Sequence, residues 1–182
     1  MRITVIPITL MILMFTGCGA KSYWPKVFDN LPDDPNHIYA RAMSESKNQQ
    51  HALNTAREEG RVEIARQLES KIMAMFKRFI EETGGAADSE LLQMTSDVSK
   101  SVVATTIYGC KPIKEEVKEE KGGVYRAYVL MKMPIGEANA ALMAKIKEYE
   151  RMYTRFRASK AFNELSEEVG KYEQYKREQG LR

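Results

Sequence analysis

The stretch QQHALNTAREEGRVEIARQLESKIMAMFKRFIEE, residues 49–82, decides the fold because it predicts one long amphipathic helix. Apolar or small side chains recur along it in steps of three or four residues, which is the spacing of a single helix face. These are Leu53, Ala56, Gly60, Ile64, Leu68, Ile72, Met75 and Phe79. Because Ala52, Ala56 and Gly60 are small, we expect the first half of this helix to lie close against a sheet.

The elements around this helix are short. Residues 37–44 predict a first strand, although their alternation is imperfect. The pair Gly84-Gly85 follows the last periodic residue of the helix, where glycine commonly ends one. Asp88 or Ser89 can then cap a second helix.

A hairpin signal comes next. Residues 107–120 and 124–133 flank Gly122-Gly123, a pair of glycines that accepts the positive φ angles of a tight turn. The second run alternates in strand fashion, and the side chains that share its inner face are Tyr125, Ala127, Val129, Met131 and Met133. The mixed charges of residues 114–121 are typical of a solvated hairpin tip.

After Pro134 and Gly136, residues 134–182 predict a long amphipathic helix that runs to about Arg177. Its first apolar stripe alternates steps of four and three, and it consists of Leu142, Ile146, Tyr149, Tyr153 and Phe156. A helix of that length spans about 60 Å, so we expect part of it to project and to offer this stripe to a partner. The periodicity shifts phase before Phe162, which leaves open that the helix folds back on itself there.

Together these patterns predict an α+β protein. Its core domain, residues 37–133, has the order β-α-(α)-β-β, and the long amphipathic helix follows. A small three-stranded sheet of this kind leaves exposed edges.

The N-terminus predicts export and lipidation. Residues 1–17 carry Arg2, a short apolar run and small residues at a cleavage point, as in a secretory signal peptide. The run is shorter than the roughly 20 apolar residues that span a bilayer. The sequence Phe15-Thr16-Gly17-Cys18 resembles a bacterial lipobox, so Cys18 is the expected lipidation site. Residues 18–36, rich in proline and turn-forming residues, predict an extended tether.

The expected location follows from this N-terminus. A mature chain held by acyl chains on Cys18 binds the bacterial cell envelope through its lipid anchor without spanning the membrane. Gly19, in place of an aspartate after the cysteine, indicates the outer membrane under enteric-type sorting. Trp24 and Tyr23 suit either the membrane interface or docking onto the domain.

Composition favours no nucleic-acid partner and no catalysis. The 182 residues minus the 17 of the signal leave 165 with a net charge of +2, and no basic block stands out. Cys110 can be a buried apolar residue, a reactive thiol or an intermolecular bridge, and burial is the commonest state of free cysteine. No nucleophile elbow, phosphate loop or zinc motif occurs. We therefore predict no catalytic residue, no metal ligand and no cofactor.

A family resemblance is carried by the lipobox, by Tyr39-Ala40 and Tyr128-Val129-Leu130 in predicted strands, and by a helix motif. The motif consists of Ala52, Ala56, Arg57, Gly60, Arg61, Ile64, Ala65, Leu68 and Ile72. The chain resembles the Lpp-twenty type of bacterial lipoproteins over residues 38–133, although that family usually has alanine where Gly60 stands. The resemblance implies a β-α-β-β core similar to dodecin-like or SHS2-like domains. Some relatives are surface antigens, and others are flagellar accessory proteins that form rings or disks.

Two functions follow as hypotheses. The first is a non-enzymatic envelope lipoprotein that acts as a self-associating scaffold, related to motility, with a homo-oligomer or another envelope protein as partner. The second is a periplasmic lipoprotein that binds a cell-wall fragment or a small apolar molecule between helix and sheet. Met73, Met75, Met131 and Met133 are the candidate lining of that pocket, although methionines in such positions are more often simple core. A pocket of several hundred Å³ in the structure would favour ligand binding, and a filled core would favour the scaffold.

Overall fold

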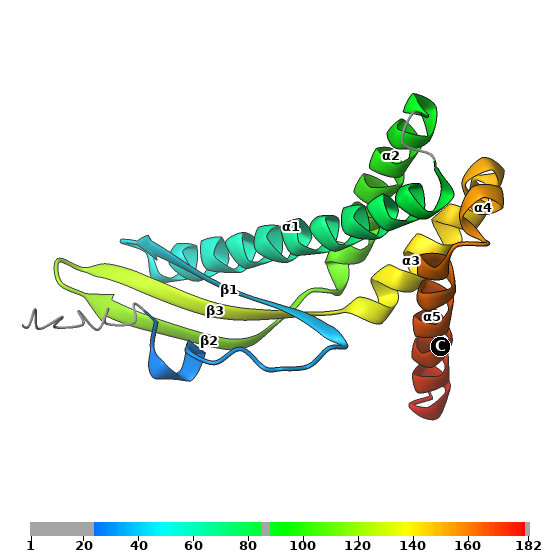
Figure 1. Ribbon diagram of the computed structural model, residues 1–182. Coiled ribbons are helices and arrows are strands. Elements are labelled where there is room, and N and C mark those ends of the chain that lie inside the picture. Colours follow the sequence, from blue (N-terminus) through cyan, green and yellow to red (C-terminus); the bar gives the residue numbers. More distant parts are fainter. Residues whose placement is uncertain (1–23, 85–87, 181–182) are drawn as a thin grey trace, which may run out of the picture.

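The computed structural model describes residues 24–84 and 88–180 (Figure 1). The predicted signal peptide, residues 1–17, and the predicted acylation site, Cys18, lie outside the described residues.

The described residues form one antiparallel sheet of three strands. Its strands are β1 (His37–Ser46), β2 (Lys111–Glu120) and β3 (Val124–Pro134), in the order β1-β3-β2. The register pairs Ile38 with Met133 at one end of β1. Gly122 and Gly123, with φ angles of 84° and 71°, turn the chain from β2 into β3. The predicted hairpin and the α+β fold class are therefore confirmed.

Helix α1 (Gln49–Thr83) covers one face of the sheet and continues well beyond it (Figure 1). Asn48 caps its start, because its side-chain oxygen accepts a hydrogen bond from the His51 amide. Gly84 ends it in the left-handed conformation, with φ 71°, as predicted. The buried face is close to the predicted one and consists of Ala52, Ala56, Gly60, Ile64, Leu68, Ile72, Phe76 and Phe79. Leu53 and Met75, which the periodicity places on it, are only partly buried.

The close approach of α1 to the sheet is confirmed at Gly60. A Cβ atom at this position would lie 2.5 Å from Met131 Cγ on β3 and 3.6 Å from Ala42 Cβ on β1. Gly60 therefore stands over the gap between β1 and β3, and hydrogen is the only side chain that fits without moving Met131.

The far end of α1 belongs to a helical bundle. It packs with α2 (Ser89–Thr106), which Asp88 caps by accepting from the Leu91 amide, and with α4 (Glu150–Phe156) and α5 (Lys160–Glu178). Helix α3 (Ile135–Glu148) packs on α2, α4 and α5. A short 3-10 turn, η3 (Ile107–Gly109), leads from α2 into β2.

The predicted long C-terminal helix is present as α5, but helix is not continuous over residues 134–182. Tyr149 leaves helical geometry, with φ −98° and ψ 94°, and separates α3 from α4. Ser159 then caps α5, since its Oγ accepts from the Phe162 amide. Helix α5 returns along α3, where Asn139 Nδ2 donates to Glu168 Oε2 at 2.7 Å. The fold-back that the phase shift left open is what the chain adopts.

An aromatic cluster explains the fold-back. Phe79 of α1 stacks on Phe156 of α4, with ring centroids 4.7 Å apart, and also contacts Phe162 of α5. Phe76 lies 6.1 Å from Phe156. Burying these rings against one another outweighs the continuation of a straight helix, because each aromatic side chain removes some 150–250 Å² from water.

The N-terminal segment packs on the other face of the sheet. Phe28, in the 3-10 turn η1 (Lys26–Phe28), is fully buried against Tyr128 and Leu130 of β3. Trp24 contacts Tyr128 edge-on at 5.8 Å, and Arg41 Nη1 donates to the Phe28 carbonyl at 2.9 Å. Residues 24–36 are therefore not the free tether that the sequence predicted, because their aromatic residues find an apolar surface on β3.

We predict that Gly60→Val lowers the free energy of unfolding by about 2–3 kcal/mol, because the branched side chain overlaps Met131 and forces α1 off the sheet. Thermal or urea unfolding measures the change. Gly170→Ala is the matched control, since a Cβ atom at this position of α5 meets nothing within 4 Å. The control should be neutral or stabilising, and an equal loss in both variants would contradict the close-approach explanation.

Candidate functional site

The predicted partner stripe lies mostly inside the protein. Leu142 and Ile146 of α3 and Phe156 of α4 are at most 1 % exposed, and Tyr153 packs edge-on against Phe162 at 5.9 Å. Only Tyr149, at the break between α3 and α4, is exposed, at 38 %. The stripe is therefore not a partner-binding surface, because the fold-back covers it with α1, α2 and α5.

The structure places the four candidate pocket methionines mostly in or beside the core. Met131 and Met133 have no exposed surface and fill the core between α1 and the sheet. Met75 packs at the margin of that core, whereas Met73 is 40 % exposed. Met131 and Met133 therefore fill the core rather than line an open pocket.

Cys110 is a core residue. It is 5 % exposed, and burial raises the pKa of its thiol to about 11. The reactive thiolate is therefore scarce near neutral pH.

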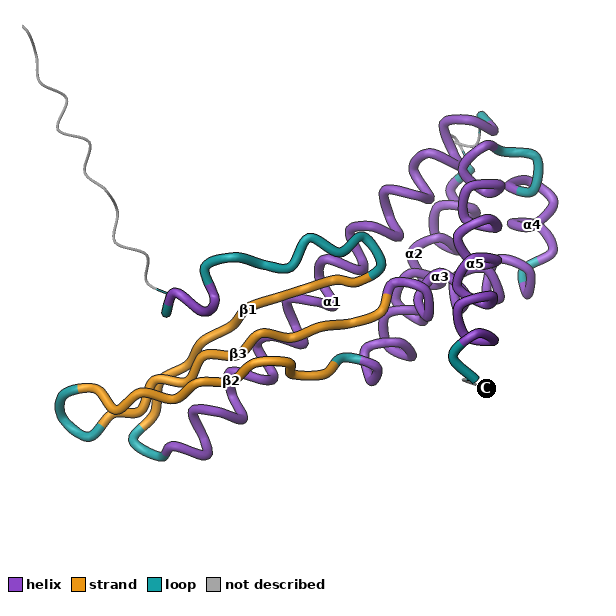
Figure 2. The backbone as a smooth tube through the Cα atoms, turned by 90° about the horizontal axis from the view of Figure 1, so that it is seen from below, coloured by secondary structure: helices purple, strands orange, loops and turns teal. Residues whose placement is uncertain are grey.

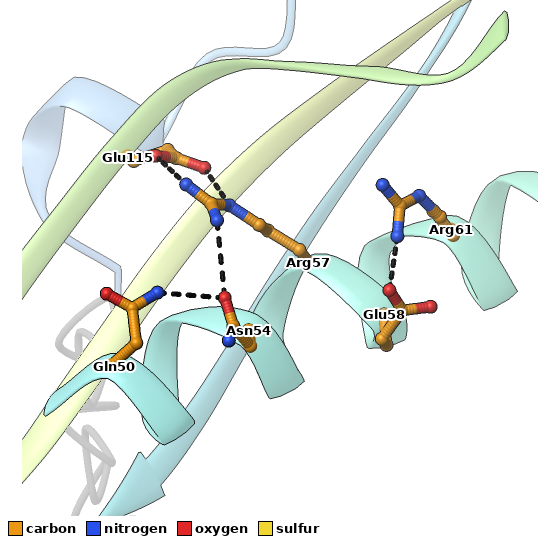
Figure 3. A network of polar contacts seen from close by, with 6 residues as sticks. All are labelled: Gln50, Asn54, Arg57, Glu58, Arg61 and Glu115. Atoms are coloured by element: carbon orange, nitrogen blue, oxygen red, sulfur yellow. Dashed lines mark hydrogen bonds and ion pairs between the residues drawn. The ribbon is translucent and has the colours of Figure 1, made fainter. Parts of the chain in front are cut away.

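The glutamates of β2 are ion-paired rather than arranged for acid catalysis. Arg57 of α1 donates two hydrogen bonds to Glu115, Nε to Oε1 at 2.6 Å and Nη2 to Oε2 at 2.8 Å (Figure 3). These bonds hold the pKa of the Glu115 carboxyl below its ordinary value, the opposite of what a general acid needs. Glu116 pairs with Lys118, and Glu120 pairs with Arg126.

A histidine–carboxylate pair lies at the turn that leads into β1. His37 Nδ1 lies 2.6 Å from Asp34 Oδ2, while Asp34 Oδ1 accepts from the Asn36 amide. The hydrogen bond from the Asn36 amide and the contact with His37 together keep the pKa of Asp34 below its ordinary value. Within residues 24–84 and 88–180, no serine hydroxyl or thiol is hydrogen-bonded to His37, so the pair fixes a turn.

An open groove of about 550 Å³ lies beside β1. Six consecutive residues of β1, from Tyr39 to Ser44, form one side of it. The flank of α1 forms a second wall, and the N-terminal segment, which runs along the β1 side of the sheet in Figure 2, forms a third. We call this the edge groove. Its remaining lining residues are Trp24, Leu31, Thr55, Glu59, Val62, Glu63, Arg66 and Gln67.

The edge groove exposes apolar side chains from all three walls. Leu31 is 44 % exposed, Met43 38 % and Val62 51 %. Val62 lies outside the apolar periodicity of α1 and faces away from the core. Packing within the chain therefore does not explain an apolar residue at this position. Apolar surface of this kind beside polar groups is a common property of binding sites.

The strand that borders the edge groove has an unpaired edge. Strand β1 pairs with β3 on one side, and no other described strand pairs with it. An edge strand presents a row of main-chain donors and acceptors to a partner. Tyr39 shows this orientation, because its carbonyl accepts a weak bond, at 3.4 Å, from the Gln67 side chain of α1.

The two edges of the sheet differ strongly in charge. Strand β2 carries lysine or glutamate at seven of its ten positions, and its register shifts between Pro112 and Lys114. Charge, proline and an irregular register are the features that keep an edge strand from pairing. Strand β1 has only Arg41 and Glu45 as fully ionised side chains, without proline or register shift, so β1 is the edge that is open to pairing.

The flank of α1 in the edge groove carries charges of both signs. Glu63 accepts from Arg66 at 2.8 Å and from Gln67 at 3.2 Å. Glu59 is exposed and has no ion-pair partner in the described part of the chain. The sequence indicated an exposed sheet edge but not this groove, because its three walls come from distant segments. The only sequence signal was Val62, an apolar residue outside the buried stripe.

Comparison with known proteins finds no match among protein-family models, curated proteins or solved structures. In the described residues, no three histidine, cysteine or acidic side chains gather where they could hold a metal ion. No helix in residues 24–84 and 88–180 has the length and apolar character needed to cross a bilayer.

We predict that Glu115→Gln lowers the free energy of unfolding by about 0.5–1 kcal/mol at pH 7, because Arg57 loses a partly buried partner. The folded-state pKa of Glu115 is depressed, so its contribution is present above the unfolded pKa and is lost as the pH falls through the folded pKa. Urea unfolding at pH 7 and at pH 3 measures both values. The difference between the variant and the parent should be smaller at pH 3 than at pH 7, and a constant difference would refute the ion-pair origin.

Proposed function

We propose that this chain is a non-enzymatic lipoprotein of the bacterial cell envelope, anchored through acylated Cys18 and working as a self-associating scaffold. The observation that carries the self-association is the edge groove, where the unpaired β1 edge lies beside exposed apolar side chains. The resemblance to Lpp-twenty-type lipoproteins extends the proposal to an outer-membrane accessory role in motility.

The lipid anchor rests on the sequence alone, and the fold adds a constraint on its reach. Because residues from Trp24 onward pack on the sheet, six residue steps separate Cys18 from the domain. A fully extended chain covers about 3.3–3.6 Å per residue, so the outer face of the sheet stays within about 20 Å of the acylated residue. A domain held so closely moves in the plane of the membrane, and tethering raises its effective concentration for its neighbours.

A second candidate function is ligand binding by an envelope lipoprotein, with a cell-wall fragment or a small apolar molecule as ligand. The volume of the edge groove, about 550 Å³, is in the usual range of ligand sites. We prefer self-association because the groove borders a strand edge that offers main-chain pairing, which a protein strand satisfies better than a small apolar molecule.

For the anchor, Cys18→Ser in the full chain should abolish incorporation of radiolabelled fatty acid and should leave the signal uncleaved or release the protein from membranes. Metabolic labelling and membrane fractionation measure these effects. Cys110→Ser is the matched control and should keep the label, because Cys110 is buried. An unlabelled parent protein that retains Met1 would refute the anchor.

For self-association, a chain that begins at Lys21 retains every described residue and should sediment as a dimer or larger species at micromolar concentration. Analytical ultracentrifugation over a hundredfold concentration range measures this. A strict monomer at the highest concentration would remove the scaffold proposal and leave ligand binding as the candidate function.

A further inference from the structure

We infer that the edge groove is a homodimer interface in which a second copy of this chain pairs its β1 antiparallel to the first, joining the two sheets into one of six strands. The inference rests on the proposed self-association and names the surface and the partner. Three features of the groove support it independently: the position of α1, the charges on its flank, and the face that carries the N-terminus.

The position of α1 allows β1 and α1 to contact β1 and α1 of the second copy at the same time. Gly60 stands over the gap between β1 and β3, so the α1 axis lies about half a strand spacing, or about 2.4 Å, inside β1. It is then about 4.8 Å from the midline between two paired β1 strands. A twofold axis on that midline brings the two α1 axes to about 10 Å, a distance at which packed helices are found.

The flank of α1 is self-complementary in charge. A twofold axis between Val62 and Glu63 places Glu59 of each copy opposite Arg66 of the other, because both lie three and a half residues from the axis. Val62, half a residue from the axis, then lies opposite Glu63 and beside Val62 of the second copy, which covers the most exposed apolar side chain of the groove. Glu59 gains an ion-pair partner that it lacks within the described residues.

The same point of α1 lies opposite the middle of the groove on β1. Gly60 stands near Ala42, and Gln67 reaches the Tyr39 carbonyl, so residues 62 and 63 lie level with residues 40–42. One axis therefore serves both the strand pair and the helix pair, as an isologous interface requires.

The dimer also suits the membrane anchor. Two antiparallel strands in one sheet are related by an axis perpendicular to the sheet, so the two copies keep their outer faces on the same side. Trp24 and Phe28 pack on that outer face. Both anchored N-termini then leave toward one membrane, which a face-to-face dimer of the sheets would not allow.

Cysteine cross-linking of the full-length protein in bacterial membranes tests the interface. Val62→Cys should give a disulfide-linked or bis-maleimide-linked dimer, because this side chain lies beside the axis. Met73→Cys is the matched control: it lies on the same helix with similar exposure, but the axis would separate its two copies by about 30 Å at 1.5 Å per residue. The parent chain should give no cross-link, since Cys110 is buried.

Charge exchange supplies a second readout. Glu59→Arg and Arg66→Glu should each weaken dimerisation about tenfold, because each change places like charges in contact twice per dimer. The double variant should recover most of the loss. Glu58→Arg and Arg61→Glu, which make the same changes at α1 positions outside the groove, should have no effect.

The outcomes separate this inference from the proposed function. A parent that self-associates by sedimentation, with no Val62→Cys dimer or with equal Met73→Cys cross-linking, overturns the interface and leaves the scaffold standing. A cross-link from Val62→Cys to a different protein overturns the homodimer in favour of another envelope partner. A parent that is monomeric in sedimentation and in membranes removes both proposals.

Discussion

The close packing of α1 on the sheet is the constraint on which the rest of the structure depends. At Gly60 no side chain beyond hydrogen separates the helix from Met131, so the helix is held over β1 and β3 at a fixed height and position. The stripe of Ala52, Ala56 and Gly60 makes the contact, and the wider core of Ile64, Leu68 and Ile72 follows it. Dispersion contacts are lost when a gap opens, so a tight helix–sheet interface has little freedom to shift.

This placement makes the two flanks of α1 unequal. On the β2 side Arg57 reaches Glu115, and the paired charges close the space between helix and strand (Figure 3). On the β1 side, the side-chain hydrogen bonds between α1 and the strand in the described residues run from Gln67 to the Tyr39 carbonyl and from Ser44 to the Ala52 carbonyl. The edge groove occupies this second flank. The β2 edge is charged and irregular, and the Arg57–Glu115 ion pair closes the flank of α1 beside it. Together these features direct any strand partner toward β1.

Local signals in the sequence predicted those elements whose boundaries depend on local chemistry. Gly84 ends α1 and Gly122-Gly123 turns the hairpin because positive φ angles select glycine wherever they occur. The break at Tyr149 has no glycine or proline to mark it, and the contacts of Phe156 with Phe79 and Phe76 favour it. The partner stripe was misread for this reason: an apolar helix face does not reveal whether it meets another molecule or another part of its own chain.

The N-terminal segment shows the same limit of sequence reasoning. Prolines and aspartates predicted an extended tether, yet Phe28 and Trp24 dock the segment because β3 offers Tyr128 and Leu130 on its outer face. Strand β3 is thus apolar on both sides, with α1 on one and the N-terminus on the other. That arrangement places Trp24, the first described residue, on the outer face of the sheet. Under the proposed lipid anchor at Cys18, this outer face would lie toward the membrane and the β1 edge would be accessible to neighbours in its plane.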